Sequence, residues 1–77
     1  MCIAVPGEIT KLFSDKGSVK VLGIEAIVNL QLIDEPQVGD YVLIHAGCAL
    51  EKINKEYYEE LATIFTDILK QQEDLYG

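Results

Sequence analysis

Apolar and polar residues alternate most regularly in segment 24–32, which reads IEAIVNLQL. Every even-numbered position there is apolar and most odd-numbered positions are polar, which predicts a strand with one buried face. Further strand-like segments lie at 8–13, 18–21, 41–46 and 49–53. The segment 41–46 is almost continuously apolar, which favours a strand covered on both faces.

The connections between these segments carry turn residues. Ser14, Asp15, Lys16 and Gly17 predict a turn after the first strand, and Gly23 permits a tight hairpin. The polar segment 34–40 contains a proline and a glycine, and we expect it to be a surface loop.

The period changes to that of a helix after residue 54. Asn54 is an N-cap residue by type, and Glu56 would place a negative charge in the first turn, where the helix dipole favours it. The apolar positions recur at helical spacing: Tyr57, Leu61, Ile64, Phe65, Ile68 and Leu69. A stripe of this kind most often packs against a core.

Several short strands followed by one amphipathic helix predict a mainly β fold. We expect a small, closed or nearly closed OB-like β-barrel of about five strands with a C-terminal amphipathic α-helix. Residues 1–54 would form the barrel and residues 55–77 a helix packed on or beside it, in a single domain. A chain of 77 residues buries a small core and is marginally stable.

The charge of the chain restricts its partners. Thirteen acidic residues against six lysines give a formal net charge of −7. An acidic surface repels phosphate backbones, so nucleic-acid binding is not expected. No apolar run approaches the roughly 20 residues of a membrane span, and no targeting segment is evident. We therefore expect a cytoplasmic protein with free thiols, without nucleic-acid or membrane partners.

Cys2 is the strongest candidate for chemistry. A residue as small as cysteine permits removal of Met1, which would give one residue both a free α-amine and a thiol. A neighbouring ammonium favours the thiolate, which is the form that binds metals. The following Pro6 and Gly7 would give this terminal segment a defined path into the first strand. The alternative is a small residue tolerated at a chain end.

His45 is the only histidine of the chain. In a regular strand it shares a face with Tyr41 and Leu43, and such a residue is more often structural than a ligand. Close to Cys2 it could supply a nitrogen ligand, but one cysteine and one histidine do not complete a four-ligand zinc site. Cys48 lies between small residues, where a packing role is the default.

Two stretches of this sequence resemble the HypC/HupF/HybG family of hydrogenase-maturation chaperones. They are MCIAVPG at 1–7 and VGDYVLIHAGCA at 38–49, followed by an acidic helix, and the resemblance spans essentially the whole chain. One departure is Cys48, where the family commonly has an aromatic residue. The resemblance implies an OB-type barrel with a C-terminal helix.

The resemblance also implies a function. Members are scaffolds and carriers for the iron–dicyano–carbonyl group of nickel–iron hydrogenase. They bind the iron–sulfur protein HypD and then the precursor of the hydrogenase large subunit. The family's essential cysteine falls on Cys2, a less certain role near the iron on His45, and partner contacts on Cys2, Pro6, Gly7 and His45. The iron would be transient cargo, with no permanent cofactor, and the protein would not be an enzyme.

Two other function classes stay open from the residues alone. The first is an OB-type binding module for an oligonucleotide or a protein, in which Cys2 is incidental. The second is a thiol enzyme built on Cys2 and His45, although no orienting third group or oxyanion site can be identified.

Overall fold

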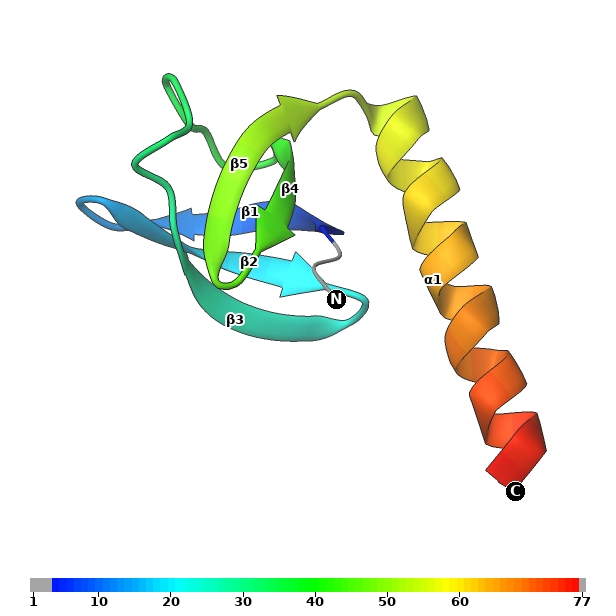
Figure 1. Cartoon of the computed structure of the whole chain (residues 1–77). Coiled ribbons are helices and arrows are strands. Elements are labelled where there is room, and N and C mark those ends of the chain that lie inside the picture. The colour runs from blue at the N-terminus through cyan, green and yellow to red at the C-terminus, as the bar shows by residue number, and fades with distance from the viewer. Residues whose placement is uncertain (1–3, 77) are drawn as a thin grey trace.

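The strands of the computed structural model, which describes the backbone of residues 4–76 and the side chains of residues 4–68, close into a barrel (Figure 1). The strands are β1 (Val5–Leu12), β2 (Lys16–Val21), β3 (Ile24–Asn29), β4 (Tyr41–His45) and β5 (Cys48–Ile53). They are hydrogen-bonded in the order β1-β2-β3-β5-β4, and β4 pairs with β1. The predicted OB-like barrel of five strands with a C-terminal helix is confirmed.

Two hairpins use two-residue turns that require positive φ. Val21 pairs with Ile24 across a turn in which Leu22 has φ 51° and Gly23 has φ 89°. The turn between β4 and β5 repeats this geometry, with φ 53° at residue 46 and 78° at residue 47. Positive φ at both central positions is the signature of type I′ turns, whose twist matches that of the flanking strands. The tight hairpin expected at Gly23 is confirmed.

The barrel core is aliphatic. Its buried members are Ile9, Val19, Val28, Leu30, Ile33, Val42, Ile44 and Ala49. In β4 the side chains of Val42 and Ile44 point into this core, whereas Tyr41, Leu43 and His45 on the other face are half-buried. The strand therefore alternates, and the expectation that it is buried on both faces was wrong.

The first half of β3 is exposed on both faces. Val28 and Leu30 are buried as the alternation predicted, but Ile24 is 71% and Ile27 59% exposed. The cause is the weak closure of the barrel here, because β3 pairs with β5 only between Asn29 and Cys48. The predicted buried face is thus confirmed only for the C-terminal part of the segment.

Helix α1 (Lys55–Tyr76) extends away from the barrel along its length (Figure 1). The predicted cap is confirmed, because the backbone N–H of Tyr57 donates to Asn54 Oδ1 at 2.7 Å. The helix contacts β1 and β4, and the ring of Tyr58 stacks on Tyr41 with centroids 4.3 Å apart. The first turns of α1 are therefore anchored on the barrel.

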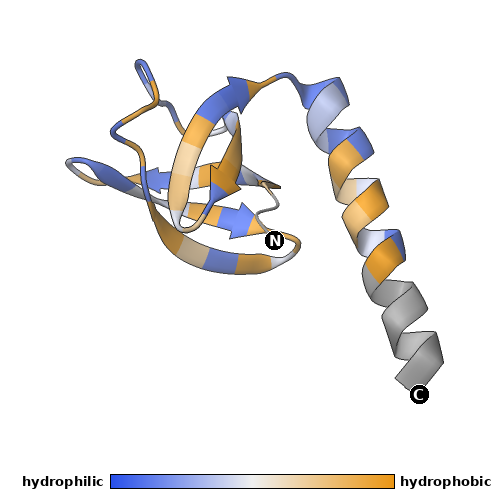
Figure 2. Ribbon diagram, in the orientation of Figure 1, coloured by the Kyte–Doolittle hydropathy of each residue, from blue (hydrophilic) through white to orange (hydrophobic). Residues whose placement is uncertain are grey.

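The apolar stripe of α1 is only partly covered. Leu61 and Phe65 are half-buried, but Tyr57, Ile64 and Ile68 are 44%, 53% and 45% exposed. Figure 2 shows the resulting hydrophobic bands on a helix that stands beside the barrel. The expectation that this stripe packs into a core was wrong for the three exposed residues, because α1 touches the barrel on one side only. Within the described part of the chain, no helix has the length and hydropathy that a membrane crossing needs.

Candidate functional site

The N-terminal end of β1 runs beside the end of β4. The two strands are antiparallel, and the register pairs Val5 with Ile44, Pro6 with Leu43 and Gly7 with Val42. His45 is the next residue after Ile44, so it lies level with the point where the N-terminal segment leaves the sheet. The fold therefore brings the start of the chain next to the only histidine, although 40 residues separate them in sequence.

Cys2 itself lies outside the described residues. The first described residue, Ala4, is half-buried and directly precedes the pairing of β1 with β4. Two residues then separate His45's register position from the thiol-bearing residue in sequence, a span of under about 8 Å even when fully extended. The predicted association of Cys2 with His45 is thus within reach of the backbone, and it stays a prediction.

His45 occupies the outer face of β4. It is half-buried and pairs with Cys48 across the β4–β5 turn. The predicted sharing of a face with Tyr41 and Leu43 is confirmed by the burial pattern of the strand. This is also the strand against which α1 packs, so the histidine lies on the side of the barrel that carries the helix.

Pro6 and Gly7 pack inside the sheet. Both are buried, and they lie within β1, three and two residues earlier than the strand that the sequence predicted from residue 8. A Cβ on Gly7 would overlap Val19 Cγ1 and come within 2.8 Å of Ile44 Cδ1. Gly7 is therefore required by close packing rather than by a turn. Direct contact of either residue with a partner stays a prediction.

Cys48 opens β5 and is half-buried. Its sulfur lies 3.7 Å from the carbonyl oxygen of Ala49, a contact at the weak end for a thiol donor. Cys48 thus joins β5 to both β3 and β4 through its backbone. Among residues 4–68, no group of three or more His, Cys, Asp or Glu side chains is arranged to hold a metal.

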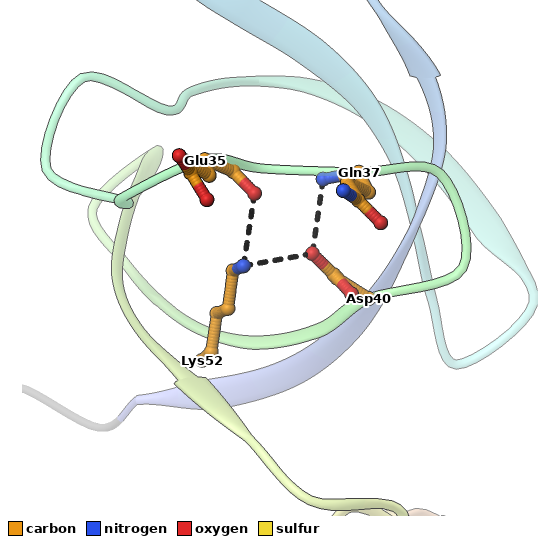
Figure 3. Close-up of polar contacts among 4 residues, drawn as sticks. All are labelled: Glu35, Gln37, Asp40 and Lys52. Carbon is orange, nitrogen blue, oxygen red and sulfur yellow. Dashed lines mark hydrogen bonds and ion pairs between the residues drawn. The ribbon is translucent and has the colours of Figure 1, made fainter.

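A polar clamp positions the start of β4, and the sequence did not predict it. Lys52 Nζ lies 3.2 Å from Asp40 Oδ2 and donates to the carbonyl of Glu35 at 2.9 Å, while Gln37 N–H donates to Asp40 Oδ2 at 2.9 Å (Figure 3). The backbone of Asp40 also accepts from Ile9 N–H at 2.9 Å. The clamp therefore fixes the loop onto β1 and β5 and helps to set the register that ends at His45.

The Lys52–Asp40 pair is missed because its partners are twelve residues apart. Val42 faces Lys52 across the β4–β5 ladder, so only the strand register shows that Lys52 lies beside the residue that precedes β4. Two further polar features lie away from the N-terminal segment. Hydrogen bonds from Ser18 and then Thr10 lower the pKa of Glu25 below its ordinary value.

The base of α1 has its own electrostatic environment. Burial, and after it the nearby Glu8 carboxylate, raise the pKa of the Tyr58 hydroxyl above its ordinary value. This phenol therefore stays protonated at neutral pH, where its ring stacks on Tyr41. The contact between helix and barrel is accordingly a neutral aromatic pair.

Comparison with known proteins identifies relatives over nearly the whole chain. The model of the HupF/HypC family matches residues 1–65. Hydrogenase maturation factor HypC of Cupriavidus necator is 34% identical over 73 residues, covering 94% of this chain and 81% of the relative. HypC of Rhizobium leguminosarum is 37% identical over 68 residues, covering 87% and 91%. HypC of Escherichia coli K12 is 39% identical over 61 residues, covering 71% and 68%.

Proposed function

This chain belongs to the HupF/HypC family, and from that premise we propose that it is a hydrogenase-maturation chaperone that carries iron as cargo. In this proposal it works in the cytoplasm and is not an enzyme. It holds the iron–dicyano–carbonyl group through Cys2 while bound to a HypD-like iron–sulfur partner, and it then delivers the group to the precursor of the hydrogenase large subunit.

The observation that supports the proposal most directly is the pairing of β1 with β4. It anchors the N-terminal segment at Val5–Ile44 and leaves the residues before it level with His45. Low-spin iron that carries cyanide and carbon monoxide is a soft centre, which a thiolate suits better than a carboxylate. The N-terminal thiol, with the imidazole or the α-amine as its neighbour, is the softest donor set of the chain.

A carrier must also release its cargo. One thiolate assisted by a single nitrogen holds a metal less permanently than the closed four-ligand cage of a structural site. The buried Pro6 and Gly7 hold the base of the segment in the sheet, so only the few residues before Val5 need to move during transfer.

Substitution of the N-terminal thiol tests this function. We expect Cys2→Ala to abolish hydrogenase maturation and to remove the infrared bands of iron-bound cyanide and carbonyl from the anaerobically purified complex. The matched control is Cys48→Ser, which changes the other thiol and should leave both readouts nearly intact. Full maturation with Cys2→Ala would overturn the proposal.

A further inference from the structure

The exposed apolar residues of α1 form one continuous line. Tyr57, Leu61, Ile64 and Ile68 follow one another at spacings of four, three and four residues, which places them on one side of the helix. We call these four residues the apolar seam. Three of them are 44–53% exposed, whereas the half-buried Phe65 lies on the adjoining side. The barrel therefore covers only the flank of the seam.

The other flank of the seam is acidic. Glu56, Glu60 and Asp67 each come one position before a seam residue, so they lie on the same side of it. All three are exposed, and we call them the acidic border. Lys55 is the only basic residue between positions 55 and 68, and it lies on the opposite side of the helix. The uncovered surface thus pairs an apolar line with negative charge along one edge.

This arrangement defines the chemistry of what covers it. An amphipathic helix binds in an apolar groove through residues at such spacings, and the charges beside it select the partner. We infer that the apolar seam docks in a groove of the HypD-like partner whose wall opposite the acidic border carries lysine or arginine. This inference rests on the proposed function, because that function supplies the partner.

A second copy of the chain does not suit the seam. Two copies would bring like acidic borders together on molecules that each carry a net charge of −7. The three exposed seam side chains offer roughly 300 Å², taking about 200 Å² as the full surface of a large side chain. A stable interface needs about 800 Å² from each partner. The seam is therefore one part of a larger contact.

The assembly partner is favoured over the large-subunit precursor by the duration of binding. The group on the iron is built in several steps while this complex persists, whereas delivery ends in release. Differences in affinity among related complexes lie mostly in the dissociation rate, which added apolar contact slows. The seam then prolongs the assembly complex, and the N-terminal thiol handles the cargo.

Charge reversal on neighbouring residues tests the acidic border. The full-length chain is titrated against the purified HypD-like partner under anaerobic conditions at about 50 mM and 500 mM salt. We expect Glu60→Lys to weaken binding about tenfold at low salt and less than about threefold at high salt, because exposed charges are screened. The matched control Glu59→Lys makes the same change about 100° further round the helix and should stay within about twofold. Equal effects of the two variants, or none, would overturn the inference.

Polar substitution tests the seam itself. Ile64→Gln keeps helix propensity and should weaken partner binding by about tenfold or more, whereas Thr66→Gln on the far side should not. Circular dichroism of each variant checks that the helix is retained. Loss of precursor binding with partner binding intact would contradict the inference. So would a dimer of the chain that Ile64→Gln dissociates.

The two proposals can fail separately. If Cys2→Ala matures hydrogenase normally while Ile64→Gln still weakens the partner complex, the cargo role is wrong and the docking surface stands. If the seam variants bind the partner as the unchanged chain does while Cys2→Ala blocks maturation, the docking surface is wrong and the cargo role stands.

Discussion

The packing around Gly7 allows a quantitative test of how β1 is held. An alanine there would place a methyl group against Val19 Cγ1, Ile44 Cδ1 at 2.8 Å and Val21 Cγ2 at 3.1 Å. Val19 and Ile44 are core residues with 0% and 5% exposure, so neither can move into solvent. Overpacking of such a site costs about 1–3 kcal/mol, and we expect Gly7→Ala to lower the free energy of unfolding by about 2 kcal/mol.

A second substitution identifies the clash as the cause. Val19→Ala removes the Cγ1 atom that the new methyl would overlap, and by itself it should cost about 2 kcal/mol through lost burial and a cavity. In the double variant the Gly7→Ala methyl occupies the vacated space. The total loss should then be about 2–3 kcal/mol rather than the roughly 4 kcal/mol expected from additivity, with Ile44 limiting the recovery.

Urea unfolding of the four proteins measures this coupling. The midpoint should shift while the dependence on denaturant stays constant, because the surface exposed on unfolding changes little. If the losses from Gly7→Ala and Val19→Ala add to within about 0.5 kcal/mol, the two sites do not interact and the close-packing explanation is refuted.

Two further predictions concern the helix start and a carboxylate on the outer face of the barrel. Asn54→Ala should cost about 1 kcal/mol and reduce helical circular dichroism, because Tyr57 N–H loses its acceptor; unchanged ellipticity and stability would contradict this. The pKa of Glu25 is lowered by Ser18 and Thr10, so its ionised form stabilises the fold above about pH 4.5, and that stability is lost as the pH falls through the lowered pKa. Unfolding of the unchanged chain should therefore show a steeper loss on acidification below about pH 4.5 than unfolding of Glu25→Gln, and identical pH profiles would refute the role of these hydrogen bonds.

The sequence predicted features that depend on neighbours in the chain. The Asn54 cap is a contact across three residues, and the Gly23 hairpin is a property of its own dihedral angles. The alternation in β4 also follows from the strand period, even though the apolar run at 41–46 concealed it. Propensity and periodicity are local, so they suffice for these elements and for the order in which they occur.

Features that depend on distant neighbours were not predictable in the same way. Ile24 has the parity of the buried positions Val28 and Leu30, yet it is exposed because β5 meets β3 only at Asn29. The Lys52–Asp40 clamp likewise requires the register of β4 on β5. No pattern in the sequence states which strands pair, so burial at a barrel opening cannot be deduced from alternation alone.

The approach of the N-terminal segment to His45 combines both kinds of information. The sequence selected Cys2, Pro6, Gly7 and His45 by residue type and resemblance, and the pairing of β1 with β4 explains how they form one region. The same strand β1 pairs with β2 through its middle and packs Ile9 and Gly7 into the core. The position of the N-terminal segment is therefore a property of the barrel core.

The exposed stripe of α1, by contrast, is independent of that core. Tyr58 and Asn54 fix the base of the helix, while Ile64 and Ile68 lie beyond the barrel contacts and contribute little to its packing. Substitutions at these two positions should thus change binding without changing stability, and substitutions at Gly7 should change stability first. A chaperone built this way can vary its affinity for a partner through the helix while the strand that positions its thiol stays constant.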